Sequence, residues 1–371
     1  MGKDSLTLEL WSPDGITTRY DNLDDEIRNL KYGSRSPGGF SACSWEMYRS
    51  PQRLFDDIGI TNTVRIYHGP RLVWHGQIVS VQRTIGDEVT LAVQADGFSG
   101  RLKTRLTTTG VAAGQKGSDW ITGVLLADAD LDFDAGVINT ADFAFPYGVD
   151  MSPHITFEEG LNRINKANGY YWGITGVTPG TFRPVFDWYP KPEAPDLYVS
   201  IEESDSDLAY SVDDVINFVR YAYTIDGSTY QYGYVQDAAS QGRWRRRDGE
   251  IALQGKANSA TAIQVATVFL NERKLLKPQT SFTCRTVHDA AGAVIPVFEV
   301  LAGPVLRIPD LFPAEMIIAD AETVNEMSTF EVVEAVVDVD AGCVTVAPGR
   351  TGLALEKMLA YLDALQPPNR S

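Results

Sequence analysis

Clustered carboxylates are the first residues in this sequence whose types and spacing could carry chemistry. Aspartates alternate with apolar residues from Asp128 to Asp134, so an extended segment would place four carboxylates on one face. Oxygen ligands of this kind suit Ca²⁺. The EF-hand pattern fails, because a loop beginning at Asp130 would have Ala135 where glycine is required and Ala141 where the bidentate Glu belongs. A solvated acidic strand or loop is therefore favoured over a calcium site.

Two adjacent glutamates, Glu158 and Glu159, could supply the acid and the base of a glycosidase. Neighbouring residues on a helix point about 100° apart, which is a poor geometry for two carboxylates that must flank one bond. Glu159 also lies three residues after Thr156, the spacing of a helix capping box. We therefore interpret the pair as the start of a helix.

The other candidates for metal or nucleophilic chemistry are isolated in the sequence. They are four histidines and three cysteines: His68, His75, His154, His288, Cys43, Cys284 and Cys343. His68 and His75 flank an expected hairpin, but a metal site needs a third ligand that the spacing does not provide. The separated cysteines indicate no disulfide framework, and no nucleophile elbow, phosphate loop or His-Glu-x-x-His motif occurs. We expect no metal, no cofactor and no catalytic residue, and hence a protein that is not an enzyme.

One basic run lies in a strongly acidic chain. Its residues are Arg243, Trp244, Arg245, Arg246 and Arg247, whereas the chain as a whole carries a formal charge of −17. That charge disfavours stable binding along a phosphate backbone. Arginine forks bind carboxylates with two hydrogen bonds, so the run is a candidate subunit interface with an acidic neighbour. A plain surface strand, and contact with single-stranded nucleic acid through Trp244, are the alternatives.

Composition favours a β-rich globular protein of two or three domains. The 371 residues are 44% hydrophobic and include 32 Gly, 19 Pro, 16 Tyr and 15 Phe, which is typical of short strands joined by many turns. No run approaches 18 apolar residues, and residues 1–30 carry no signal-peptide pattern. We therefore expect neither a membrane span nor secretion by a signal peptide.

Local patterns place strands in the first hundred residues and a helix after them. Alternation and turn residues predict an antiparallel barrel or sandwich from strands at Ser5–Trp11, Val64–Tyr67, Val73–Ile78 and Val89–Val93. Residues 107–150 have a looser pattern of loops. A helix of about four turns then runs from Thr156 to a glycine cap at Gly169 and leads into an aromatic strand, Tyr170–Ile174.

The longest ordered pattern runs from Asp213 to Thr283. An alternating strand, Val215–Tyr223, precedes an Asp226-Gly227 turn, and a helix capped at Ser259 ends before Pro278. The helix carries an apolar stripe of Ile263, Ala266, Phe269 and Leu270. Further strands are expected at 294–301, 303–308 and 330–346, and Leu355, Leu359 and Leu362 predict a C-terminal helix.

This order of elements resembles the hub proteins at the tip of phage tails and at the base of contractile injection machines. The similar features are a strand containing Asn217, a connection with Asp237, Ser240, Gly242 and Arg243, an Ala-rich helix, and a return strand after Pro278. The Gly38-Gly39 pair and the stretch Ala95-Asp96-Gly97-Phe98 resemble the first domain of siphophage tail-tip hubs, which are minor tail proteins.

The resemblance implies a mainly β fold with two tail-tube-like β-barrel domains, accessory helices and a C-terminal helix. The expected domains are an N-terminal barrel at 1–106, an accessory α+β domain or insertion at 107–200, a second barrel at 201–350 and the helix at 351–371. In this family the segments of different domains can interleave.

The resemblance also implies a structural virion protein at the phage tail tip, assembled in the host cytoplasm. Such a hub is a homotrimer whose ring continues the tail-tube lumen and joins the hexameric tube to the trimeric tip. Its partners would be tail-tube and distal-tail proteins and a tip, spike or fibre protein, with DNA passing only transiently through the lumen and no stable membrane insertion. The alternatives are a tail-associated cell-wall hydrolase and a carbohydrate- or receptor-binding tail protein. The latter rests on Tyr170, Tyr171, Trp172, Trp188 and Tyr189, which core packing explains equally well.

Overall fold

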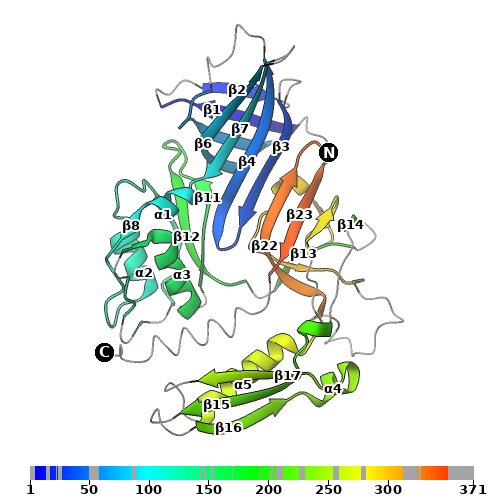
Figure 1. The fold of residues 1–371 in the computed structure, drawn as a ribbon. Coiled ribbons are helices and arrows are strands. Elements are labelled where there is room, and N and C mark those ends of the chain that lie inside the picture. The colour runs from blue at the N-terminus through cyan, green and yellow to red at the C-terminus, as the bar shows by residue number, and fades with distance from the viewer. Residues whose placement is uncertain are drawn as a thin grey trace.

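A computed structural model describes most of the chain. The described residues are 5–13, 17–21, 23, 27–49, 58–85, 89–142, 144–145, 148–151, 154–168, 170–192, 194–200, 204–205, 212–224, 230–253, 259–276, 281–311, 324 and 327–349. The fold is mainly β with minor helices, as the sequence predicts (Figure 1). The buried apolar side chains of the described residues form three hydrophobic cores. The predicted C-terminal helix, the Asp226-Gly227 turn, Gly169 and Pro278 lie outside the described residues.

The first seven strands form one continuous antiparallel sheet. In space their order is β2–β1–β5–β6–β7–β4–β3. Burial alternates along β1, where Leu6, Leu8 and Leu10 face the core, as the period of a strand requires. The bounds are β1 (Leu6–Trp11), β2 (Thr17–Asp21), β3 (Ile27–Arg35), β4 (Gly38–Arg49), β5 (Thr63–His68), β6 (Arg71–Ile85) and β7 (Val89–Gly97).

Strands from the C-terminal part of the sequence continue this sheet. β3 pairs with β22, and the order then runs β22–β23–β18–β14. β21 also pairs with β22 and carries β13 beside it, with β19 and β20 following. One core therefore contains residues from both Leu6–Ala95 and Leu197–Val346. The bounds are β13 (Pro195–Tyr198), β14 (Ser204–Asp205), β18 (Phe282–Cys284), β19 (Val287–His288), β20 (Val294–Ile295), β21 (Val305–Arg307), β22 (Thr329–Asp338) and β23 (Cys343–Pro348).

The strand expected at 294–301 is wrong after its first two residues. β20 ends at Ile295, and a 3-10 turn, η6 (Val297–Glu299), follows because Pro296 has no amide hydrogen to donate to a ladder. Glu299 N instead donates to the carbonyl of Pro296.

A second body consists of short helices packed against three neighbouring strands, Asp134–Ile138, Tyr170–Val177 and Pro184–Pro190. Its core includes Trp120, Phe145, Trp172, Phe186 and Trp188. The predicted helix start is present, since Thr156 Oγ1 accepts a hydrogen bond from Glu159 N at 3.1 Å. The bounds are α1 (Gly100–Thr104), β8 (Leu106–Thr107), α2 (Gly117–Trp120), the π-helical turn η3 (Ile121–Leu125), β9 (Asp134–Ile138), β10 (Ile155–Thr156), α3 (Phe157–Asn168), β11 (Tyr170–Val177) and β12 (Pro184–Pro190).

The Gly38-Gly39 pair joins this second body to the main sheet. β4 runs parallel to β11 at these glycines, with Gly39 opposite Ile174. Gly39 has φ +89°, and a Cβ there would lie 2.3 Å from the backbone nitrogen of Ile174. Only glycine allows this approach, because any side chain would collide with backbone atoms.

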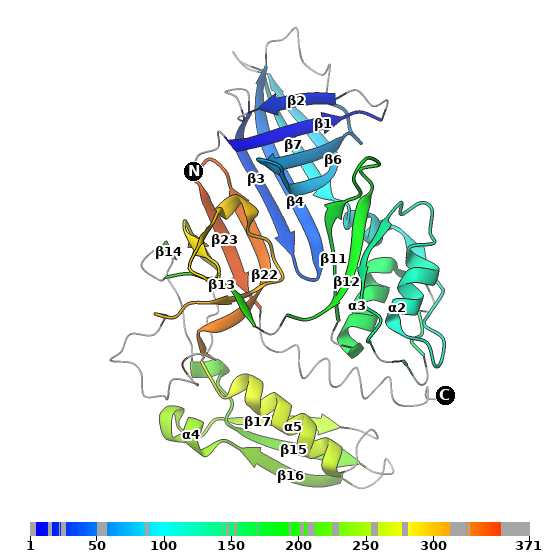
Figure 2. The ribbon, with the colours of Figure 1, turned by 180° about the vertical axis from the view of Figure 1, so that it is seen from behind.

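A third body, Phe218–Arg273, has its own three-stranded sheet and core. The order is β16–β15–β17, and α5 covers one face through Ala262, Val265 and Ala266 (Figure 2). Both views place this body below the rest of the molecule. The bounds are η5 (Val212–Asp214), β15 (Phe218–Thr224), β16 (Tyr230–Gln236), α4 (Ala238–Trp244), β17 (Asp248–Leu253) and α5 (Ser259–Arg273).

The third body differs from the expected role of Asp213–Thr283 as strands of a second barrel. Among the described residues, no ladder joins its sheet to the main sheet. Val219, Tyr221 and Tyr223 find their apolar partners on α5, so the strand buries its core face locally. Among the described residues of this segment, Val215, Leu275 and Leu276 belong to the main core, and Trp244 packs against it.

Candidate functional site

The predicted arginine run forms the connection between α4 and β17. α4 ends at Trp244, and Arg245 then adopts a positive φ of 59° with ψ 171°, a non-helical conformation after which the chain enters β17. Trp244 is half-buried and packs against the main core. The run therefore lies where the third body meets the rest of the chain.

Buried Asn217 holds this connection in place. Its Nδ2 donates to the carbonyl of Arg245 at 2.8 Å, and its Oδ1 accepts from the amide of Arg247 at 2.8 Å. Its backbone oxygen accepts from Asp237 N, at the start of α4. Asn217 is 0% exposed, so its amide and the neighbouring backbone groups cannot bind water. These hydrogen bonds take the place of the lost hydrogen bonds to water.

A second set of polar contacts fixes α4 to the end of α5. Asp237 caps α4 by accepting from Ser240 N at 2.8 Å and also pairs with Lys274 Nζ at 3.2 Å. Ser240 Oγ donates to the carbonyl of Lys274 at 2.6 Å. The Asn, Asp and Ser that the sequence singled out thus act as a structural network.

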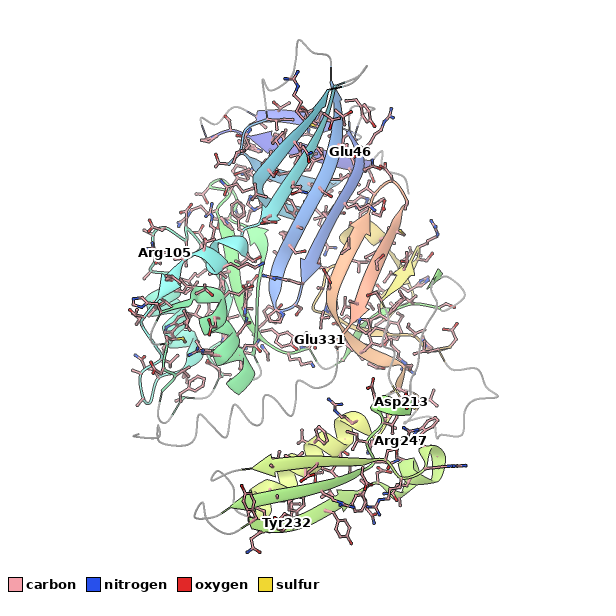
Figure 3. All side chains as sticks on the ribbon, viewed as in Figure 1. Glu46, Arg105, Asp213, Tyr232, Arg247 and Glu331 are labelled. Carbon is pink, nitrogen blue, oxygen red and sulfur yellow. The ribbon has the colours of Figure 1, made fainter. Side chains whose placement is uncertain are left out.

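Two of the arginines are paired inside the chain. Arg246 donates to both carboxylate oxygens of Asp248, at 2.7 and 3.2 Å, and its guanidinium lies 3.6 Å from the ring centre of Phe218. This hydrogen bonding lowers the pKa of Asp248. Arg247 pairs with Asp213 at 3.4 Å, and both residues are labelled in Figure 3. Arg245 and Arg246 remain exposed, whereas Arg243 and Arg247 are half-buried.

A row of exposed tyrosines lies on β16 of the third body, and the sequence patterns above did not identify it as a surface. Tyr230, Tyr232 and Tyr234 are 43%, 76% and 61% exposed. Their i, i+2, i+4 spacing is the available signal, because it places all three on one face of the strand. The spacing alone equally predicts a core face, so only the position of α5 on the opposite face identifies these residues as a surface.

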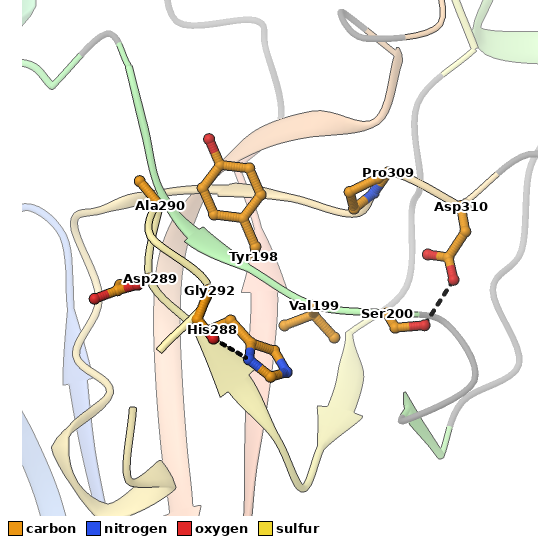
Figure 4. Close-up of a pocket in the computed structure, with 9 residues that line it drawn as sticks. All are labelled: Tyr198, Val199, Ser200, His288, Asp289, Ala290, Gly292, Pro309 and Asp310. Carbon is orange, nitrogen blue, oxygen red and sulfur yellow. Dashed lines mark hydrogen bonds between the residues drawn. The ribbon is translucent and has the colours of Figure 1, made fainter. Parts of the chain in front are cut away.

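A pocket of about 430 Å³ lies beside β13 and β19 (Figure 4). Its polar groups are bound locally: Ser200 Oγ donates to Asp310 at 2.6 Å, and Asp289 accepts from the amides of Ala291 and Ala293. His288 Nδ1 faces the carbonyl of Gly292 at 3.4 Å. Ser200 is therefore bonded to a carboxylate and not to the histidine, which is not the arrangement that activates a serine nucleophile. The pocket is lined by Tyr198, Val199, Ser200, His288, Asp289, Ala290, Gly292, Pro309 and Asp310.

The alternating aspartates do not converge on a common site. Arg105 pairs with Asp128 and Asp130, whereas Arg183 pairs with Asp132 and Asp134. Within the described part of the chain, no group of three or more His, Cys, Asp or Glu side chains is close enough to hold a metal ion. The segment is a set of surface ion pairs, and only Asp134 begins a strand.

The glutamate pair and the histidines each have separate surroundings. Glu158 pairs with Arg35, while Glu159 pairs with Arg163 one helical turn away at 2.7 Å. His68 contacts Glu299 at 2.6 Å. His75 is buried edge-on against Phe98, and burial, with a smaller contribution from two arginines, lowers its pKa from 6.5 to about 3.

The aromatic residues considered for sugar stacking are mostly core residues. Tyr171, Trp172 and Trp188 are at most 1% exposed, so the part of the carbohydrate hypothesis that rests on them is wrong. Tyr170 and Tyr189 are half-buried. Their alternation reflects packing between β11 and β12, where Trp172 lies opposite Trp188.

None of the described helices is long and apolar enough to span a membrane.

Solved structures with a similar arrangement are known. The 43 kDa tail protein of prophage MuSo2 from Shewanella oneidensis is 14% identical with a TM-score of 0.58, and the match covers 94% of this chain and 98% of that one. A tail protein from Neisseria meningitidis MC58 is also 14% identical, with a TM-score of 0.57 and coverage of 95% and 99%. Prophage tail protein gp18 from Listeria monocytogenes EGD-e is 7% identical, with a TM-score of 0.57 and coverage of 97% and 98%.

This chain has the fold of phage tail proteins. The match extends over almost all of its length, so the tail-protein fold includes the main sheet, the helical body and the third body. No protein-family model and no curated protein matches the sequence. The resemblance that local motifs indicated is thus confirmed at the level of the fold.

Proposed function

We propose that this chain is a structural virion protein, a hub subunit of a phage tail tip or baseplate. The observation that carries the proposal is the match to three tail proteins over at least 94% of this chain and at least 98% of each of theirs. A tail-protein fold shared over whole chains favours the same type of role, although at such low identity it does so by analogy.

The proposed hub is a homotrimeric ring that continues the tail-tube lumen. The two halves of the main sheet, β1–β7 and β13–β23 without the third body, would be the two tube-like barrels of each subunit, and three subunits would then present six barrels to a hexameric tube. Tube or distal-tail proteins would bind one side of the ring, and a tip, spike or fibre protein the other. DNA would pass through without stable binding, because an acidic chain of −17 repels a phosphate backbone.

A structural role also accounts for the polar residues of the structure. In the pocket beside β13, Ser200, His288 and Asp289 are each engaged in local hydrogen bonds. Buried Asn217 serves the backbone of the arginine run. Wall hydrolysis has no comparable support from the geometry.

Sedimentation equilibrium of the purified full-length protein tests the proposal. We expect a mass three times that of the chain at micromolar concentration, with dissociation on dilution. A monomer at every concentration up to 100 micromolar, both alone and with the tail-tube protein of the same phage, would contradict it.

A further inference from the structure

The face of the third body opposite α5 is an unusual surface, called here the tyrosine face. It consists of Phe218, Arg220, Tyr230, Tyr232, Tyr234 and Arg246. The ladder places Tyr232 opposite Ala222 and Tyr234 opposite Arg220, on the side of the sheet away from the α5 core. Figure 3 shows Tyr232 at the margin of the molecule, pointing away from the rest of the chain.

The aromatic side chains of this face are held in a fixed arrangement. The rings of Tyr230 and Tyr232 lie 6.3 Å apart at 27°, and the ring of Tyr234 stacks on Phe218 at 5.1 Å and 16°. Arg246 covers the same Phe218 ring. Tyrosine and arginine are, with tryptophan, the residues most enriched at the energetic centres of protein interfaces, and ordered rings lose little entropy on binding.

Charge distinguishes this body from the remainder of the chain. Residues 218–273 contain seven Lys and Arg against five Asp and Glu, which gives a formal charge of +2. Because the whole chain carries −17, the residues outside this body together carry −19. On the tyrosine face, Arg220 and Arg246 both contact Asp248, and Glu250 lies opposite Arg220 in the β15–β17 ladder. The excess positive charge therefore belongs to the third body as a whole, with exposed Arg245 next to the face, and this body suits an acidic partner surface.

We propose that the tyrosine face docks onto an acidic surface of the neighbouring copy of this chain. This inference rests on the proposed ring. A contact between a basic body on one copy and an acidic body on the next is head-to-tail, and head-to-tail contacts generate closed rings when the rotation closes. The positive third body of one copy would attract the acidic surface of the next copy, and the tyrosines would supply the apolar area that is buried between the two copies.

The test compares the assembly of two double variants with that of the wild type. Tyr232→Thr/Tyr234→Thr removes two exposed rings while keeping residues that favour strands. Val137→Thr/Val294→Thr is the matched control, because these residues are 67% and 64% exposed and lie on other bodies. We expect the tyrosine variant to dissociate at a concentration at least tenfold higher than the wild type and the control to assemble normally. The melting temperature of the tyrosine variant's monomer should fall only by the loss of the stacking between Tyr234 and Phe218.

Arg245→Glu is an independent variant, because this exposed arginine neighbours the face and reversing its charge should weaken docking without removing apolar surface. If the wild type assembles and both the tyrosine variant and Arg245→Glu assemble equally well, the docking proposal is overturned while the ring survives. A wild type that never self-associates overturns the ring and the docking together. Binding of cell-wall polysaccharide that is lost in the tyrosine variant, with assembly intact, would overturn docking in favour of a glycan site.

Discussion

Protonation of His75 should control the acid stability of the main sheet. The imidazole is 1% exposed on β6, its Nε2 has no hydrogen-bond partner, and it lies opposite Arg65. Burial and the positive charges of Arg65 and Arg101 lower its pKa from 6.5 to about 3. The unfolded chain therefore takes up a proton as the pH falls through 6.5, whereas the folded protein does so only near pH 3.

The size of the effect follows from this difference in pKa. At pH 7 both states are largely neutral at His75, and the site contributes almost nothing to the pH dependence. A pH of 5 is about 1.5 units below the pKa of His75 in the unfolded chain, so His75 is protonated in the unfolded chain but not in the folded protein. This difference lowers the free energy of unfolding by about 2 kcal/mol. The loss continues toward pH 3 and then levels off, because both states are protonated there.

Urea unfolding followed by far-ultraviolet circular dichroism at pH 7, 6 and 5 measures this contribution. Between pH 7 and pH 5 we expect the free energy of unfolding of the wild type to fall by about 2 kcal/mol more than that of His75→Gln, because glutamine at position 75 does not titrate. His154→Gln is the control, because His154 is exposed, and it should follow the wild type. Parallel pH profiles for the wild type and His75→Gln would show that the folded protein does not disfavour protonation of His75.

Three further substitutions or measurements test the packing. Asn217→Ala leaves two backbone groups of the arginine run without partners and should destabilise the third body by about 2–4 kcal/mol in urea unfolding. Gly39→Ala should cost more than Gly180→Ala in the same assay, because the two glycines share φ near +88° but only Gly39 faces backbone atoms of Ile174; the control should lose about 1 kcal/mol. Cys284, whose pKa burial raises to about 12, should resist a thiol reagent at pH 8 in the native protein and react in urea.

Each of these expectations has a distinct contrary result. Asn217→Ala with wild-type stability would mean that water replaces the amide at the connection. Equal losses for the two glycine variants would remove the argument from close approach. Rapid labelling of native Cys284 would contradict the burial of the strand that carries it.

Local signals in the sequence predict local structure well. The Thr156–Glu159 spacing gives the start of α3, and the alternation of Leu6, Leu8 and Leu10 gives the buried face of β1. These features depend on contacts within a few residues, and the side chains that make them are adjacent in the sequence.

Long-range packing is where the sequence prediction fails or stays open. A strand within Val215–Tyr223 is correctly expected, although β15 begins only at Phe218. Periodicity shows which side of a strand is apolar and not which element covers it. α5 covers it, so the segment forms a separate body. Likewise, β3 pairs with β22 about 300 residues away, and no local pattern specifies that ladder.

The candidate site shows the same limit at the level of side chains. The arginine run is visible in the sequence, but its partners Asp213 and Asp248 and the ring beneath Arg246 depend on how α4 and β17 fold around Asn217. The tyrosine row has the spacing of a core face and becomes a surface only because α5 occupies the other side.

Negative-stain electron microscopy of the purified full-length protein would show the proposed ring itself. We expect closed rings of three subunits with a central hole and six similar lobes on the side that meets the tube. A field of compact particles of single-subunit size, at concentrations where sedimentation also reports a monomer, would contradict it.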